Sequence, residues 1–141
     1  MGYYPEEIVE PMRQDILIAG FEDLRTPEEV DKFMEKSKGS TAVIFVNSVC
    51  GCAAGAARPG LKIALQQAHK KPEFLGTVFA GADIEATTKA REYMQPFPPS
   101  SPSLALFKNG QLVWFMPRYE IEGRTPEELA EVITQAFETF C

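Results

Sequence analysis

The chain has 141 residues, of which 45% are hydrophobic and 24% are charged. This length and composition are typical of one soluble globular domain that can bury its own core, and the hydrophobic fraction is too high for a disordered chain. Fourteen Lys and Arg against twenty Asp and Glu give a net charge of −6, which argues against nucleic acid or an anionic membrane surface as the main partner. The longest apolar runs, 42–46 and 104–107, are far shorter than the roughly 20 residues that cross a membrane.

Residues 1–7 show no basic start, no apolar stretch and no small-residue cleavage site. We therefore expect no secretory signal and a cytoplasmic location. In that reducing compartment the three cysteines are a poor basis for a disulfide framework, so metal or redox chemistry becomes the better expectation.

Helical patterns occur in several parts of the chain. Residues 5–19 place apolar side chains at helical spacing, with a break expected at Pro11. The sequences Thr-Pro-Glu-Glu at 26–29 and again at 125–128 are capping boxes with proline at the first helical position, so each one predicts the start of a helix. Two further helical segments are expected at about residues 50–70 and 85–94.

Strand patterns lie between these helices. The continuous apolar runs 42–46 and 77–80 are typical of buried strands. The runs 103–107 and 111–115 flank Asn109-Gly110, which is the strongest short signal for a β-hairpin.

The order of these elements predicts an α/β domain. The first strand–helix–strand unit predicts a right-handed parallel crossover, and the hairpin adds antiparallel strands. The simplest packing is a mixed central sheet with helices on both faces. We expect a single domain over residues 1–141, with residues 1–40 as an N-terminal helical extension packed on it.

Cys50-Gly51-Cys52 occupies a position suited to thiol chemistry. The motif follows the buried strand 42–46 after a three-residue turn and opens the next helical segment. Ligands and chemistry gather at the carboxyl ends of central strands. The first turn of a helix offers unpaired N–H groups and a positive dipole end, which lower the pKa of a thiol below its free value of about 8.5. The sequence therefore predicts a thiolate nucleophile here.

The spacing of the two cysteines has its own consequence. Cysteines at i and i+2 can meet in a disulfide, but the ring is small, and Gly51 supplies the backbone freedom that it needs. A strained disulfide is reduced more easily, so the pair should accept electrons readily and be a poorer reductant than Cys-x-x-Cys. Two alternatives are buried cysteines that pack as small apolar residues, and a zinc site completed by Cys141 and His69.

The proline-rich segment 96–102 leads into the strand at 103–107. The Ser101-Pro102 bond is a candidate cis peptide, with a stiff all-trans turn as the alternative.

Taken together, these elements resemble the thioredoxin fold, and several segments resemble the bacilliredoxin family of small thioredoxin-like proteins more closely. The Cys-Gly-Cys-Ala-Ala-Gly run is the most specific of these segments. The segments that carry the resemblance are 50–59, 78–81, 90–93, 98–103 and 117–124.

The resemblance implies a role for each site residue. Cys50 would be the nucleophile that removes bacillithiol from S-bacillithiolated proteins, and Cys52 would be the resolving thiol. Gly51 would belong to the same catalytic motif. Pro102 would be a cis-proline packed against the sulfurs, and the backbone of Ser101 would bind a substrate strand.

The resemblance also implies partners. Bacillithiol would be a thiol co-substrate with no bound cofactor, and client proteins would carry bacillithiol caps or disulfides. A flavin-dependent bacillithiol disulfide reductase would act downstream, and disulfide isomerase activity is a further implication.

Three observations leave alternatives open. Tyr119 stands where the family pattern leads us to expect histidine, which puts a secondary acid–base role in doubt. Cys141 is interpreted as a surface thiol, with an intermolecular disulfide or a third exchange thiol as alternatives. A metal-binding or metal-delivery protein using Cys50, Cys52 and Cys141 is the rival function, and a redox-inert interaction module on the same fold is the third.

Overall fold

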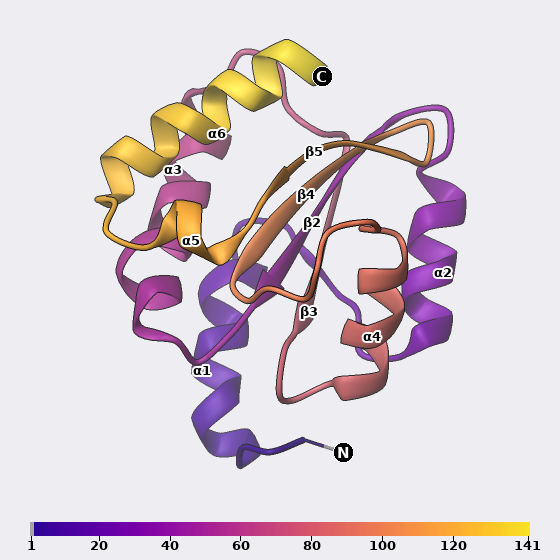
Figure 1. Cartoon of the computed structure of the whole chain (residues 1–141), viewed down its shortest axis with the longest axis vertical. Coiled ribbons are helices and arrows are strands. Elements are labelled where there is room, and N and C mark those ends of the chain that lie inside the picture. The colour runs from indigo at the N-terminus through magenta and orange to yellow at the C-terminus, as the bar shows by residue number, and fades with distance from the viewer. Residues whose placement is uncertain (1) are drawn as a thin grey trace.

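The computed structural model describes residues 2–141 and consists of a central sheet between two helical layers (Figure 1). The elements, in chain order, are α1 (Glu6–Leu17), β1 (Glu22–Asp23), α2 (Pro27–Lys36), β2 (Thr41–Asn47), the π-helical turn η1 (Ala53–Ala57), α3 (Arg58–Gln67), β3 (Phe74–Phe79), α4 (Ile84–Glu92), β4 (Ser103–Lys108), β5 (Gln111–Met116), α5 (Arg118–Ile121) and α6 (Pro126–Phe140).

The sheet has five strands in the order β1-β3-β2-β4-β5. The strands β1, β3 and β2 are parallel, whereas β4 runs antiparallel to β2 and β5 antiparallel to β4. The expected mixed sheet of an α/β fold is therefore confirmed. Because β2 pairs on both edges and is covered on both faces, residues 42–47 are all buried, as the continuous apolar run indicates.

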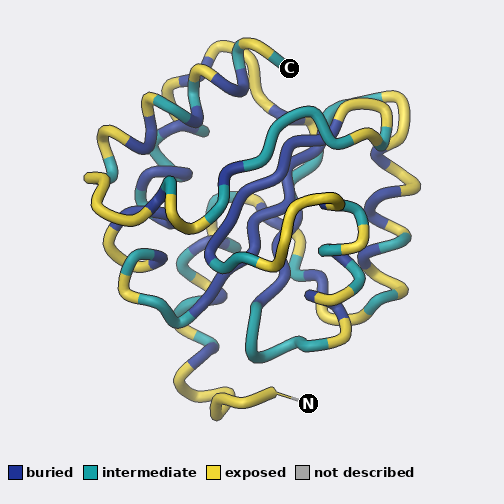
Figure 2. Tube along the Cα trace, in the orientation of Figure 1, coloured by how far each residue is buried: buried dark blue, intermediate teal, exposed yellow. Residues whose placement is uncertain are grey.

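The helices divide between the two faces of the sheet. In Figure 1, α1, α3 and α6 cover one face, and α2 and α4 cover the other. Each face has its own buried apolar cluster, one containing Leu61 and Phe137 and the other Phe33 and Phe107. Figure 2 shows that the buried residues are concentrated along the central strands. Both capping boxes form as predicted at the starts of α2 and α6.

The N-terminal residues also contribute to the sheet. Strand β1 pairs in parallel with β3 through Glu22 and Asp23, and a strand of two residues leaves no periodic signal in the sequence. Arg13, at the centre of α1, is buried and pairs with Asp83 ahead of α4 through Nη1–Oδ2 and Nη2–Oδ1 contacts of 2.5 and 3.2 Å. This ion pair joins α1 to the loop after β3.

Two prolines lie within helical segments. The predicted break at Pro11 is wrong, because α1 continues through it. Pro11 lies exposed in the second turn of α1 and has no backbone N–H to donate to the carbonyl of Glu7. Because Glu7 is also exposed, water can hydrogen-bond to this carbonyl instead. Pro59 follows a π-helical turn, in which Arg58 N–H bonds to the carbonyl of Ala53. The wider turn accommodates a proline that cannot donate to the preceding turn.

Candidate active site

Buried polar groups shape the loop that carries Cys50. The side chain of Asn47, the last residue of β2, donates from Nδ2 to the carbonyl of Met12 at 3.1 Å. Its Oδ1 accepts from the backbone N–H of Ser48 at 2.9 Å. Ser48 Oγ in turn accepts from the backbone N–H of Cys50 at 3.0 Å. The first cysteine is therefore positioned by a chain of hydrogen bonds that begins in the central strand.

The side chain of Arg58 hydrogen-bonds to the buried residues of this loop and does not face the thiols. Its Nη1 donates to Asn47 Oδ1 at 2.8 Å and to the carbonyl of Ser48 at 3.2 Å. Its Nε pairs with Asp15 of α1 at 2.9 Å, and Asp15 also pairs with Lys62. The guanidinium is buried, so its charge is compensated within the protein, as a buried charge requires.

The two sulfurs lie together at the start of the helical segment. Cys50 Sγ and Cys52 Sγ are 2.9 Å apart, longer than a disulfide of about 2.05 Å, so the pair is a hydrogen-bonded dithiol. The carbonyl of Cys50 accepts from the N–H of Ala53 at 3.0 Å, which begins the helical turn. Gly51 is exposed, and a Cβ added there would meet no atom within 4 Å. Space around the motif therefore does not require glycine.

The pKa values of the two thiols move apart. Desolvation raises the pKa of Cys50, but the hydrogen bond from Cys52, the backbone N–H groups of Cys52 and Ala53, and the charge of Arg118 outweigh it, so the net shift is downward. Burial, the hydrogen bond to Cys50 and its negative charge raise the pKa of Cys52 to about 11. Cys50 is thus the residue that ionises first, and Cys52 holds the proton.

The proline-rich loop lies at the same edge of the sheet. Strand β4 pairs with β2 so that Ser103 lies opposite Val46, which places the preceding residues near the loop that follows β2. The Ser101–Pro102 peptide bond is cis, and Pro102 is buried.

A cavity of about 440 Å³ joins these parts. Cys50 and Ser101 both line it, together with two arginines from other elements, Arg91 of α4 and Arg118 of α5. A nucleophilic sulfur at the wall of a cavity can react with a disulfide bound there.

Comparisons with known proteins agree with this geometry. A family model described as "Disulphide isomerase" matches residues 4–141. A bacilliredoxin of Geobacillus kaustophilus is 52% identical over 138 residues, which cover 98% of this chain and 94% of that protein. A bacilliredoxin of Cytophaga hutchinsonii is 51% identical over 135 residues, which cover 96% and 98% of the two chains.

The chain belongs to the bacilliredoxin family.

Solved structures show the fold of this bacilliredoxin chain. Fasciola hepatica thioredoxin superposes with a TM-score of 0.59 at 15% identity and covers 86% of this chain and 100% of its own. Thioredoxin O2 from Arabidopsis thaliana in the oxidised state gives 0.57 at 17% identity, with coverage of 84% and 96%. The predicted thioredoxin-like fold is therefore confirmed. As a bacilliredoxin with this fold, the chain is a thiol–disulfide oxidoreductase.

The third cysteine does not reach the bacilliredoxin motif. Cys141 lies beside Thr41 at the start of β2 and near Lys108, whereas Cys50 follows the other end of that strand (Figure 1). The seven residues of β2 separate the two ends by about 20 Å. A metal site or an exchange relay that brings Cys50, Cys52 and Cys141 together is therefore wrong. Within residues 2–141, no group of three His, Cys, Asp or Glu side chains is arranged to hold a metal ion.

His69 and Tyr119 are also away from the sulfurs. His69 follows α3, and its backbone N–H donates to Glu138 of α6 at 3.0 Å. Tyr119 is 75% exposed on α5 and does not line the cavity at Cys50.

Sequence reasoning missed the two arginines beside Cys50. Arg91 and Arg118 both lie in segments that resemble bacilliredoxins, 90–93 and 117–124, but only the tertiary structure brings them to the cavity at Cys50. Arg91 belongs to a helix whose facing could not be read from its mixed pattern. Tyr4 was missed too, and its ring covers Gly81 at the cavity rim, where an added Cβ would lie 2.7 Å from Tyr4 Cε2.

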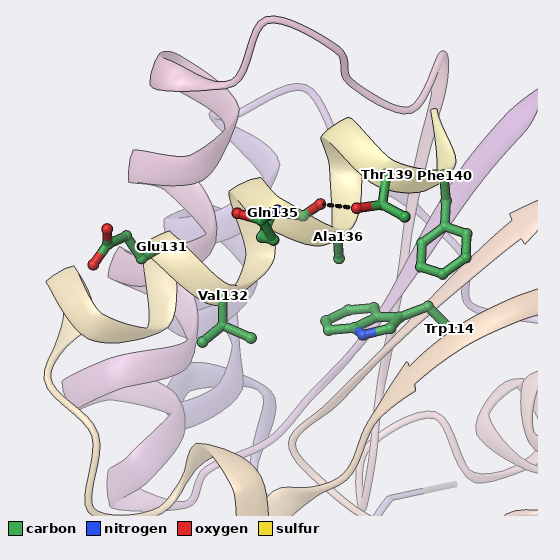
Figure 3. Close-up of a pocket in the computed structure, with 7 residues that line it drawn as sticks. All are labelled: Trp114, Glu131, Val132, Gln135, Ala136, Thr139 and Phe140. Atoms are coloured by element: carbon green, nitrogen blue, oxygen red, sulfur yellow. Dashed lines mark hydrogen bonds between the residues drawn. The ribbon is translucent and has the colours of Figure 1, made fainter.

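Another cavity, of about 460 Å³, lies between β5 and α6. Figure 3 shows the indole of Trp114 facing the side of α6 there, with no sulfur among the residues drawn. Its lining residues are Trp114, Glu131, Val132, Gln135, Ala136, Thr139 and Phe140. None of these is a thiol or a histidine, so the cavity at Cys50 is the one suited to the redox chemistry.

None of the helices within residues 2–141 is both long and apolar enough to cross a membrane.

Proposed function

We propose that this protein removes bacillithiol from S-bacillithiolated client proteins, with Cys50 as nucleophile and Cys52 as resolving thiol. The observation that carries the proposal is the opposite shift of the two thiol pKa values at a sulfur–sulfur distance of 2.9 Å. Membership of the bacilliredoxin family supports bacillithiol as the thiol co-substrate.

The first step is a thiol–disulfide exchange. The Cys50 thiolate attacks the cap sulfur of the mixed disulfide, a Cys50–cap disulfide forms, and the client leaves as a thiolate. The client sulfur is thereby reduced, and Cys50 is oxidised. The lowered pKa of Cys50 supplies the attacking thiolate near neutral pH.

The second step releases the cap. Cys52 loses its proton to solvent and attacks Cys50, which forms a Cys50–Cys52 disulfide and expels the bacillithiol thiolate. Alternatively, a second bacillithiol attacks the cap and leaves with it as bacillithiol disulfide. In the first route bacillithiol would reduce Cys50–Cys52. Both routes yield bacillithiol disulfide, which a flavin-dependent reductase would return to the thiol.

The cis-proline loop supports binding of the client. Ser101 lines the cavity beside Cys50, and the loop continues into a strand of the sheet at Ser103. In this proposal the backbone of Ser101 pairs with an extended client segment that carries the capped cysteine. Such edge pairing supplies affinity through main-chain hydrogen bonds and little sequence preference.

Disulfide isomerase activity is the second candidate function. The family model carries that description, and the same Cys50 attack on a protein disulfide would begin an isomerisation. Burial raises the pKa of Cys52, and this cause persists after Cys50 has entered a mixed disulfide. It slows resolution by Cys52 and gives the mixed disulfide time to rearrange.

Intact-mass analysis of a capped client tests the proposal. Wild-type protein should restore the free client thiol, Cys50→Ser should abolish the reaction, and Cys52→Ser should accumulate protein that carries the cap. Cys141→Ser is the matched control and should act like wild type. Full activity in Cys50→Ser, or a cap that remains on the client with wild-type protein, would show that the assignment is wrong.

A further inference from the structure

We propose that Arg91 and Arg118 form a carboxylate-binding subsite beside Cys50, which holds an acidic thiol cap by its carboxylates while the cap sulfur is attacked. This inference rests on the proposed function and adds the chemistry by which the cap is recognised. Both arginines line the cavity of about 440 Å³ that also contains Cys50.

The charge of the cavity is the first observation. The whole chain carries a net charge of −6, yet the described residues that line this cavity include two arginines and no carboxylate. A cationic cavity in an acidic protein attracts anions and repels cations. A guanidinium matches a carboxylate in a two-point, charge-assisted hydrogen bond.

Arg91 carries the second observation. It extends from α4, and its Nε is buried without a hydrogen-bond partner among residues 2–141. Its Nη2 reaches the carbonyl of Ser100 at a long 3.5 Å. Burial lowers its pKa, because no carboxylate compensates the desolvated charge. Arg91 as a whole is partly buried and lines the cavity. Desolvated guanidinium groups are ordinarily paired with carboxylates, so this one is suited to an anionic ligand.

Arg118 lines the same cavity from a different element, α5. Its side chain is about half exposed, and its Nε pairs with Glu122 at 3.3 Å. The Cys50 sulfur and the Glu122 carboxylate both raise the pKa of Arg118, and Cys50 contributes most. The guanidinium is thus close to the reacting sulfur, and Glu122 orients it through one edge.

Ser100 fixes both arginines relative to the cis-proline loop. Its Oγ accepts from the backbone N–H of Arg118 at 2.7 Å. Its carbonyl accepts hydrogen bonds from Nη2 of Arg91 at 3.5 Å and from Oγ of Ser103 at 2.9 Å. One residue at the start of the loop therefore connects α4, α5 and β4 around the cavity.

The subsite determines which sulfur is attacked. A mixed disulfide offers Cys50 two sulfurs, and a cap held by its carboxylates presents its own sulfur. The Cys50 thiolate then bonds to the cap sulfur, the old sulfur–sulfur bond breaks, and the client leaves with the electron pair as a thiolate. Bacillithiol is an acidic thiol of this class, since its malyl group carries carboxylates.

Two caps on one neutral client peptide test the subsite. One peptide is capped with mercaptosuccinate, which bears carboxylates, and the other with 2-mercaptoethanol, which bears none. Cap removal is followed by mass spectrometry, and each rate is divided by the rate with free dithiothreitol to correct for intrinsic reactivity. We expect wild-type protein to prefer the acidic cap by about tenfold or more, the value of one charge-assisted hydrogen bond.

Variants separate the subsite from general thiol reactivity. Arg91→Gln and Arg118→Gln should each lower the preference several-fold, and Arg118→Gln should also slow both caps because it raises the pKa of Cys50. Arg124→Gln, which removes the same charge at an exposed position outside the cavity, should keep the preference. If Arg91→Gln fails to fold, two measurements still test the subsite. They are the preference of the wild-type protein for the acidic cap and the loss of that preference in Arg118→Gln, which changes an exposed residue.

The outcomes distinguish the subsite from the proposed function. Removal of both caps at equal corrected rates would overturn the subsite and leave the proposed function intact. Failure to remove either cap, or bacillithiol itself, would overturn the proposed function. A third arm uses the neutral cap on a peptide with glutamates beside the cysteine. A preference found only there would show that the arginines recognise the client, and the inference would be wrong.

Discussion

The hydrogen bond between the two cysteines provides a direct test of how Cys50 is activated. The S–H of Cys52 donates to the Cys50 sulfur across 2.9 Å and contributes to the lowered pKa of that thiol. Cys52→Ala removes the donor, whereas Cys52→Ser keeps a hydroxyl donor at the same position. Both variants lack the resolving thiol, so they differ mainly in this hydrogen bond.

The expected size of the effect follows from the exposure of the site. A hydrogen bond to a charged group contributes about 1.5–3 kcal/mol, and about 1.4 kcal/mol corresponds to one pKa unit. Cys50 is partly exposed, so water replaces part of the lost interaction, and the lower end applies. We expect the pKa of Cys50 to rise by about one unit in Cys52→Ala and by clearly less in Cys52→Ser.

The assay is alkylation of Cys50 by iodoacetamide across a pH series, in a Cys141→Ser background. The reaction rate follows the thiolate fraction, so its midpoint reports the pKa. If Cys52→Ala and Cys52→Ser titrate together at the wild-type midpoint, the hydrogen bond does not activate Cys50. The activation would then belong to the helix N–H groups and Arg118.

Three further variants test other parts of the molecule. Cys141→Ser should leave the rate of cap removal within about twofold of wild type in the intact-mass assay, because β2 separates the two sites by about 20 Å; a large loss would place Cys141 in the reaction. Arg58→Met should lower the free energy of unfolding by about 2–4 kcal/mol in urea denaturation, because it leaves Asp15 and Asn47 without their buried partner; an unchanged midpoint would contradict this. The same variant should flatten the acid dependence of stability. Burial raises the pKa of Asp15, but its hydrogen bonds to Lys62 and Arg58 outweigh burial, so the net shift is downward. In the wild type the ionised Asp15 therefore stabilises the fold above its ordinary pKa of about 4, and this stabilisation is lost as the pH falls below that value. Gly76→Ala should cost about 1–3 kcal/mol by thermal unfolding, because the new methyl group would lie 2.9 Å from two buried apolar side chains; a neutral result would mean that those side chains move aside freely.

Local signals in the sequence determined most of the secondary structure. The apolar run at 42–46, the hairpin at Asn109-Gly110 and both capping boxes form as predicted, because each depends on neighbouring residues alone. Strand β1 could not be found in this way. Its two residues are held by pairing with β3, which is distant in the chain.

The features of the candidate site also fall into those that the sequence predicted and those that only the tertiary structure revealed. The sequence placed Cys50 and Cys52 after a central strand and at a helix start, and this position depends only on the order of elements. The tertiary structure decided the rest. It brought Arg118 and Arg91 to the cavity from two other helices, turned Arg58 inward to the loop, and set Cys141 at the far end of β2. Long-range electrostatics and the facing of helices depend on packing between segments far apart in the chain, and no local pattern encodes that packing.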